Sequence, residues 1–379
     1  MSFPISDMEG NVARFERRLG VLFIAVSVLH IAVLFRTSNL IAGGDMYVHL
    51  RLIELSFSSF DIRNVYAPLY HILGAFLAPI LGLSIYVKLF ALTTALSLML
   101  SFDFFRRSAN LPVECSYFFF LNPYLIYCSY QPPKIELLGY TFMFLSLAHL
   151  FRRQYAWLAV SIAFGFWAHT AAALFSLMCL GILSVFDRNW KGLFAGAFGF
   201  LLVTPLISVH LQDGCELIDA LFFFTIKAYK GETYSPSLEE LVTILFLLNP
   251  LVFLYTLFGV QTTWQHSRAI TMLGAALIGI YLHPLLIWVL NSSKVGDAID
   301  LQRGISALYL PLSVFSGMLF ATRRNIWGRA ALCSQALLSV ILPIIFLSGW
   351  ITIYIYTIDF DMLDRIKPHR CSLVWDQLD

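Results

Sequence analysis

LGVLFIAVSVLHIAVLFRTSNLIAGGDMYVHLRLIE, residues 19–54, joins an apolar stretch to a polar and charged one. The first part, from about Leu19 to Phe35, has the length and character of a helix that crosses a membrane. Arg17 and Arg18 precede it and no small-x-small cleavage site follows it, so we expect a retained first span rather than a cleaved signal peptide. The second part places a carboxylate and an imidazole directly after that span.

The composition extends this interpretation to the whole chain. Of its 379 residues, 59% are hydrophobic and only 13% are charged, which is too few charged side chains to cover a soluble domain. Six cysteines without metal-ligand spacing exclude a disulfide-dense module, although a Cys215–Cys371 disulfide stays open. A net charge of +2 excludes a basic nucleic-acid-binding domain. We therefore expect an all-α integral membrane protein that binds no nucleic acid.

Charge clusters and Pro, Gly and Asn breaks divide the chain into about eleven predicted transmembrane helices. These are expected near 19–35, 85–105, 111–129, 136–151, 155–168, 171–186, 192–209, 240–259, 269–290, 304–321 and 330–354. The predicted organisation is a cytoplasmic N-terminus (1–18), a first transmembrane module (19–190) that contains a long outer loop (36–84), a variable second module (191–355) and an extracytoplasmic tail (356–379).

The basic turns decide how the apolar segment 68–83 is placed. If it crossed the membrane, the Arg-Arg pairs at 106–107 and 152–153 would lie opposite the pair at 17–18, against the positive-inside tendency. We therefore place 68–83 in the interface or as a re-entrant half-helix. The inner side then carries 13 basic and 6 acidic residues, and the outer side carries the remaining 12 and 17. The longer polar loops fall on the outer face, where we expect the active site.

The first outer loop begins with a candidate functional helix. Asp45 and His49 lie one turn apart on one face of it, and an apolar stripe that includes Ile53 would rest in the membrane interface. Gly43 and Gly44 let the chain turn out of the first span. Two interpretations of Asp45 stay open at this point, a helix N-cap and a chemically active carboxylate.

The string Asp45-x-Tyr-x-His49-x-Arg51, directly after a first span, resembles the first-loop acidic motif of the GT-C membrane glycosyltransferases. It is most similar to the catalytic subunit of oligosaccharyltransferases. Residues 66–71, Tyr-Ala-Pro-Leu-Tyr-His, are similar to the juxtamembrane segment of that superfamily, and spans ending in Arg-Arg, Leu-Asn-Pro and Arg-Arg follow in order. The resemblance covers roughly residues 15–190. It implies a GT-C-like fold with amphipathic juxtamembrane helices in the first outer loop.

The resemblance also implies roles for individual residues. Asp45 would be the catalytic base toward the acceptor, and His49 and Arg51 would lie near the donor phosphate. Glu136 would match the second acidic position, which together with Asp45 binds a divalent cation such as Mg²⁺ or Mn²⁺ in metal-dependent members. The chain has no Asp-x-Asp there and lacks the Trp-Trp-Asp string and large soluble domain of oligosaccharyltransferases. The resemblance therefore identifies a superfamily and no particular acceptor, and no cofactor is fixed by it.

Five further residues have a functional and a structural interpretation. Arg303 resembles the late-loop arginine that contacts the lipid-linked phosphate, since guanidinium binds phosphate bidentately, or it anchors the interface. Lys134 supplies a second cation or snorkels to the headgroups. His169 lines the cavity or caps a helix. Tyr70 and His71 bind substrate or belong to the aromatic belt.

The expected activity is sugar transfer from a polyprenyl-phosphate-linked donor to a glycan, lipid or protein acceptor, by inverting displacement in cell envelope glycan biosynthesis. The protein would be multi-pass in the plasma membrane or endoplasmic reticulum, with its site on the extracytoplasmic or lumenal face. Two rivals stay open, a transporter or lipid flippase and an inactive GT-C-like scaffold. A transporter would place ionisable residues and broken helices near the bilayer midplane, often in repeated halves.

Overall fold

The structure is a computed structural model in which every described residue lies in a helix or in a turn between helices. It describes residues 68–123, 125, 135–212, 249–290 and 308–348, together with some helical residues between 21 and 32 and Ile53. The described part of the chain contains no strand. This agrees with the expected all-α class.

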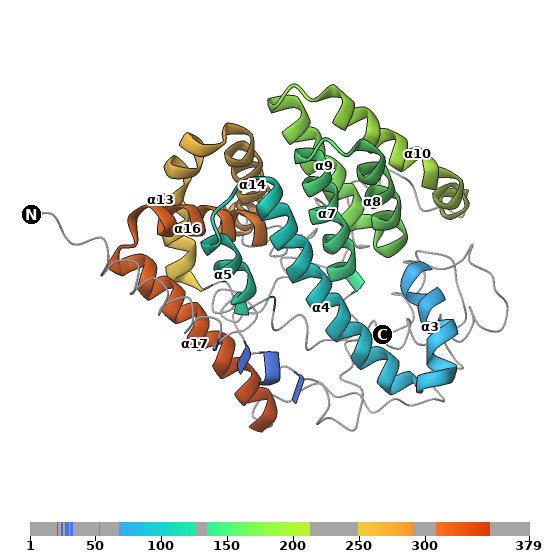
Figure 1. Cartoon of the computed structure of the whole chain (residues 1–379), viewed down its shortest axis with the longest axis horizontal. Coiled ribbons are helices and arrows are strands. Elements are labelled where there is room, and N and C mark those ends of the chain that lie inside the picture. The colour runs from blue at the N-terminus through green and yellow to red at the C-terminus, as the bar shows by residue number, and fades with distance from the viewer. Residues whose placement is uncertain are drawn as a thin grey trace, which may run out of the picture.

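The helices form a bundle in which the early and late parts of the chain pack together (Figure 1). They are α3 (Pro68–Leu81), α4 (Leu83–Ser108), α5 (Glu114–Phe120), α7 (Ile135–Phe151), α8 (Tyr155–Ala168), α9 (Thr170–Phe186), α10 (Trp190–Gln212), α13 (Pro250–His266), α14 (Arg268–Leu290), α16 (Tyr309–Arg323) and α17 (Ile326–Ser348). The helices expected at 136–151, 155–168 and 171–186 agree with α7, α8 and α9 to within one residue.

Two predicted spans contain an Asn-Pro pair at which a described helix ends or begins. The helix expected over 111–129 is interrupted after Phe120, at Leu121 and Asn122. In the span expected over 240–259, α13 begins only at Pro250, and the residues before Asn249 lie outside the described part of the chain. The second residue of each pair is a proline, which cannot donate the hydrogen bond that a continuing helix needs but suits the first turn of a new one. Asn249 also has φ 55°, outside the helical region.

Helix α17 contacts the chain at both Asn-Pro pairs. The Nε2 of Gln335 donates to the carbonyl of Phe118 at 2.6 Å, and the hydroxyl of Ser339 donates to the carbonyl of Leu121 at 2.6 Å. Before α13, the Nδ2 of Asn249 donates to the hydroxyl of Ser334 at 2.9 Å, which is a contact between side chains. Since an unpaired backbone group inside a membrane is costly, Gln335 and Ser339 make the interruption at Asn122 tolerable.

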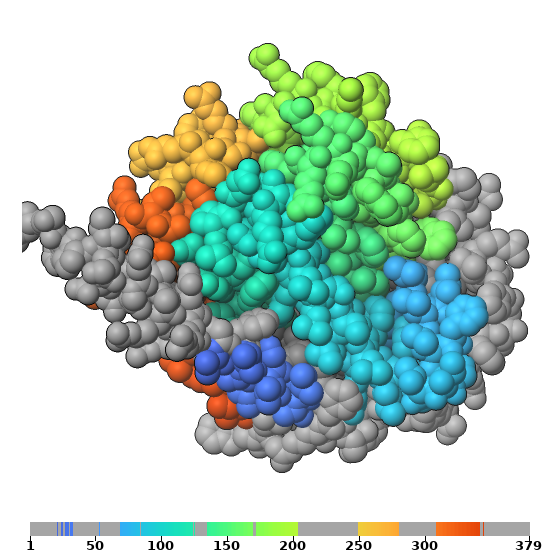
Figure 2. All heavy atoms as spheres, viewed as in Figure 1, coloured from blue at the N-terminus to red at the C-terminus, as the bar shows by residue number. Residues whose placement is uncertain are grey.

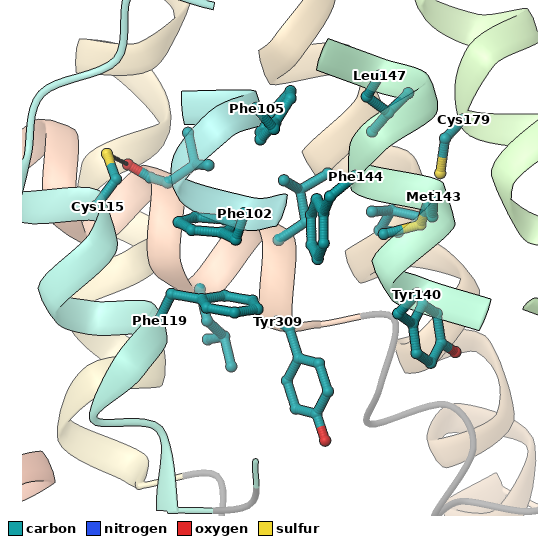
Figure 3. Close-up of a cluster of buried hydrophobic side chains, with 14 of the residues drawn as sticks. Phe102, Phe105, Cys115, Phe119, Tyr140, Met143, Phe144, Leu147, Cys179 and Tyr309 are labelled. Atoms are coloured by element: carbon teal, nitrogen blue, oxygen red, sulfur yellow. Dashed lines mark hydrogen bonds between the residues drawn. The ribbon is translucent and has the colours of Figure 1, made fainter. Parts of the chain in front are cut away.

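An aromatic cluster holds α4, α5 and α7 together. The rings of Phe102 and Phe119 are stacked with centroids 3.9 Å apart, and both meet the edge of Phe144 at 5.2 and 5.4 Å. Figure 3 shows these rings packed between the three helices. Offset and edge-to-face pairs of this kind add to the free energy gained by burial. Figure 2 shows the atoms of α4 and of the α7–α9 region forming a continuous surface around this core.

The outside of the bundle is strongly apolar. Ile80, Leu100, Phe194 and Phe258 all expose more than two thirds of their surface, which is unusual for a protein surrounded by water. Among the described residues, one helical segment, Ile85–Ser108, is long and apolar enough by length and composition to cross a membrane, and several shorter helices are apolar as well. This surface fits the hydrocarbon interior of a bilayer.

The basic turns gather at one end of the bundle. The Nε of Arg152 donates to the hydroxyl of Ser108 at 2.9 Å, which joins the turns after α7 and α4. The hydroxyl of Tyr155 donates to Oδ1 of Asn189 at 3.0 Å, which joins the α7–α8 turn to the α9–α10 turn. An ion pair of 3.3 Å between Arg324 and Glu114 brings the α16–α17 turn to the same place. We call this the basic end.

Candidate functional site

The candidate site lies at the end of the bundle opposite the basic end. Because α4, α7 and α9 all finish at the basic end, their N-termini lie together at the other one, where α3 also folds back against α4. We call it the site end. The described side chains that the sequence predicts for the site belong to α3, to the first turn of α7 and to the turn before α9.

Helix α3 contributes Tyr70 and His71, both with 0% exposure. The hydroxyl of Tyr86 on α4 donates to the carbonyl of Tyr70 at 2.6 Å, and the rings of Tyr70 and Phe90 meet edge to face at 4.5 Å. The ring of His71 lies 5.2 Å from that of Tyr70. Neither side chain lies on the lipid-facing surface, so the aromatic-belt interpretation does not hold for them in this structure.

Helix α7 contributes Glu136, which is half-buried in the first turn. The hydroxyl of Tyr140 donates to its Oε1 at 3.1 Å, across one turn of the helix. A carboxylate at a helix N-terminus is stabilised by the helix dipole. Ile135, the residue before it, packs in the same apolar cluster as Tyr70 and Phe90. The structure therefore brings Glu136 beside the α3–α4 contact.

His169 connects α8 to α9 and is 9% exposed. Its Nδ1 accepts the backbone N–H of Ala172 at 3.1 Å, so it is the N-cap of α9. A ring nitrogen that accepts a hydrogen bond carries no proton, so the ring proton of His169 is on Nε2. A Cβ built at Gly139 would lie 2.9 Å from the Cβ of His169. The absence of a side chain at Gly139 lets α7 approach the capping histidine closely.

The structure therefore gathers four of the predicted site residues: Tyr70, His71, Glu136 and His169. The capping role of His169 is confirmed, and a role in a cavity stays a prediction. The other predicted residues lie outside the described part of the chain: Asp45, His49, Arg51, Lys134 and Arg303. The Cys215–Cys371 disulfide lies outside it as well.

Lys88 is a candidate that the sequence analysis missed. It lies in the second turn of α4, two residues after Tyr86, and is only 8% exposed. It is the one lysine or arginine in the apolar stretch from Leu83 to Phe102. An ionisable residue inside an apolar helix is costly and commonly functional. An isolated lysine in an apolar stretch is a signal that is visible in the sequence.

The comparisons with known proteins concern the fold. Neither a family model nor a curated protein matches the chain. A solved structure does match, that of ArnT from Cupriavidus metallidurans in the apo state, with a TM-score of 0.52 and 15% sequence identity over 86% of this chain and 75% of that one. The chain has a GT-C-like fold. The expected polytopic, all-helical membrane architecture agrees with this match.

Glu136 is the carboxylate that the described helices place at the site end, and it could take part in binding a cation. Its Oε1 accepts one hydrogen bond from Tyr140, and a carboxylate has further acceptor positions available for a divalent ion. Among the described residues, no group of three His, Cys, Asp or Glu side chains lies together. A complete metal site at Glu136 would therefore need ligands from elsewhere in the chain, and Asp45 is the predicted one.

Proposed function

We propose that this protein is a membrane glycosyltransferase that moves a sugar from a polyprenyl-phosphate-linked donor to an extracytoplasmic acceptor. One observation carries the proposal: polar residues that are buried on α3 and in the α8–α9 turn, and half-buried on α7, lie at the site end of a GT-C-like fold. His71 and His169 are 98 positions apart in sequence, and both are buried there. The first-loop motif that resembles the GT-C glycosyltransferases supports the same conclusion.

The proposed reaction is a displacement at the anomeric carbon with inversion. Asp45 takes the proton of the acceptor hydroxyl or amide as that oxygen or nitrogen attacks the sugar. The bond between the anomeric carbon and the phosphate oxygen breaks, and the bonding electrons leave with the lipid phosphate. Arg303 and Lys134 stabilise the negative charge that develops there. Because the donor tail stays in the bilayer, a site at the end of membrane helices suits this substrate.

The described residues take supporting roles in this proposal. Glu136 binds a divalent cation together with Asp45, or orients the donor directly. His169 donates from Nε2 to a substrate oxygen while its Nδ1 caps α9. Lys88 supplies positive charge for the donor phosphate from the N-terminal part of α4. His49, Arg51, Tyr70 and His71 complete the predicted substrate-binding set.

An interrupted helix favours a transporter as the second candidate, because transporters bind ions at unwound backbone carbonyls. The contacts at the break at Leu121 and Asn122 argue against ion binding there. The carbonyls of Phe118 and Leu121 already accept hydrogen bonds of 2.6 Å from Gln335 and Ser339. An ion at this break would have to displace both side chains.

A panel of radiolabelled polyprenyl-phosphate sugars tests the proposal with the full chain in nanodiscs. We expect one donor to be consumed, with label transferred to an acceptor fraction. The Asp45→Asn variant should keep donor binding and lose about 10²–10⁴-fold in transfer rate, because an amide cannot accept the proton. Donor binding without transfer by the wild type would indicate an inactive scaffold. Lipid translocation without transfer would indicate a flippase.

A further inference from the structure

Exposed tryptophans lie at the basic end. Trp157, Trp190 and Trp327 are in the first turns of α8, α10 and α17, the helices that begin there, and they are 62%, 57% and 70% exposed. We call these three residues the tryptophan belt. Tryptophan prefers the headgroup level of a bilayer, where its ring is half in hydrocarbon and its N–H meets polar groups. The belt therefore indicates where the membrane interface crosses the bundle.

The exposed side chains beyond the belt are those of a lipid-facing surface. Along α10, Trp190 is followed by Phe194, Phe198 and Leu201, which are 72%, 57% and 61% exposed. These positions recur about once per turn and so lie on one side of the helix. The change from Trp190 to Phe194 takes place within about one turn. It places the boundary between headgroups and acyl chains in the first turn of α10.

The charge at this end is strongly positive. In the turns after α4, α7, α9, α13 and α16 and their neighbouring helical turns, the described residues include ten basic and three acidic ones. The α13–α14 turn lies on the same upper side of Figure 1 as the α9–α10 turn. The basic residues are Arg106, Arg107, Arg152, Arg153, Arg188, Lys191, Arg268, Arg323, Arg324 and Arg329. The acidic residues are Asp103, Glu114 and Asp187.

Part of this charge holds the fold together. Arg106 donates to Asp103 at 2.8 Å and to the carbonyl of Leu111 at 2.9 Å. The guanidinium of Arg152 lies 4.1 Å from the ring centroid of Phe104. Arg106 and Arg152 are therefore engaged in contacts within the bundle.

Arg153 and Arg188 are different. Both are exposed, and in the described part of the chain neither one forms an ion pair. Each sits in a turn at positive φ, 56° and 52°. Arg153 lies four residues before Trp157, and Arg188 lies two residues before Trp190. Because Tyr155 bonds to Asn189, the two turns that carry them are adjacent. Two exposed arginines therefore lie in adjacent but sequence-distant turns, at the level that the belt assigns to headgroups.

We propose that the α7–α8 and α9–α10 turns form a binding surface for anionic phospholipid headgroups, in which Arg153 and Arg188 contact the lipid phosphates. Each guanidinium carries a permanent positive charge that attracts the negatively charged lipid phosphates. The excess positive charge draws anionic lipid to this leaflet. Trp157 and Trp190 hold the turns at headgroup depth. This surface is at the opposite end from the candidate site, so it does not depend on the proposed activity.

The detergent-solubilised full chain, titrated with phosphatidylglycerol or with phosphatidylcholine, tests this proposal through the midpoint of thermal unfolding. We expect phosphatidylglycerol to raise the midpoint more than phosphatidylcholine does, and salt to weaken the difference. In Arg153→Gln/Arg188→Gln, the phosphatidylglycerol concentration that gives half of the rise should increase about fivefold for each lost charge. The matched control Arg153→Lys/Arg188→Lys keeps the charge and the same backbone cost at positive φ, and should retain most of the effect.

Three results would overturn the proposal. One is an equal rise with both lipids in the wild type. Another is an unchanged titration in the glutamine variant. The third is a lysine variant as impaired as the glutamine variant, which would show that charge is not what recruits the lipid.

Discussion

The hydroxyl of Tyr140 donates a hydrogen bond to Oε1 of Glu136, 3.1 Å away across one turn of α7. Tyr140 is itself fixed, since it is buried and its ring meets the edge of Phe175 with centroids 6.0 Å apart. A rigid donor of this kind holds the carboxylate in one orientation. Tyr140 is therefore a positioning residue for Glu136 in the proposed reaction.

The variant Tyr140→Phe tests this relationship. Removing a partner of a substrate- or metal-binding carboxylate costs about 10–100-fold in activity or metal affinity, so we expect transfer to fall by that factor while the helix stays folded. The matched control is Tyr155→Phe, which removes a comparable hydrogen bond to Asn189 at the basic end. Each variant should lose about 1 kcal/mol of unfolding free energy. Equal transfer rates in the two variants would show that Tyr140 only stabilises the fold.

Two substitutions of His169 separate its capping role from its proposed role toward substrate. His169→Ala removes the acceptor for the Ala172 N–H and should cost about 1 kcal/mol of stability. His169→Asn keeps a side-chain acceptor at the cap but loses the Nε2 donor. We expect the asparagine variant to unfold like the wild type and to bind donor about tenfold more weakly, as one lost hydrogen bond allows. Unchanged donor affinity in that variant would leave His169 as a cap alone.

The sequence predicts the regular part of the fold well where charge and apolar character alternate sharply. Helices α7, α8 and α9 are separated by short turns at Arg152–Arg153, His169 and Asp187–Arg188, so their bounds can be read from the chain. The break at Asn122 is harder to predict. The residues on both sides of it are apolar, and the interruption is made tolerable by Gln335 and Ser339 on α17.

The site residues are also predictable in part from the sequence. Glu136 stands out because it begins an apolar helix, and Tyr70 and His71 follow the juxtamembrane pattern. Their complete burial depends on α4 folding back through Tyr86 and Phe90, a tertiary contact that no local pattern specifies. Lys88 does not belong to a charge cluster, and a single lysine in an apolar helix is informative because it is isolated.

The orientation in the membrane is open to a direct test. In a cysteine-free background, single cysteines at Lys134 and Lys230 should react with an impermeant reagent from outside the cell. Cysteines at Arg107 and Arg153 should react only after permeabilisation, because basic turns stay in the cytoplasm. Arg107 is a suitable reporter, since its side chain is 67% exposed. Labelling of position 107 from outside would mean that segment 68–83 crosses the membrane, and the predicted topology would then be wrong.

The last prediction concerns Arg303, for which lysine and alanine variants distinguish phosphate binding from interface anchoring. If its guanidinium binds the donor phosphate through two parallel hydrogen bonds, Arg303→Lys keeps the charge but loses the bidentate geometry, and donor affinity should fall. Arg303→Ala should bind donor more weakly still. If Arg303 only anchors the interface, lysine serves equally well, because both side chains snorkel. Donor dissociation constants for the two variants decide between these roles. A lysine variant with wild-type affinity would remove Arg303 from the site and leave Lys134 and Lys88 as the proposed cations for the donor phosphate.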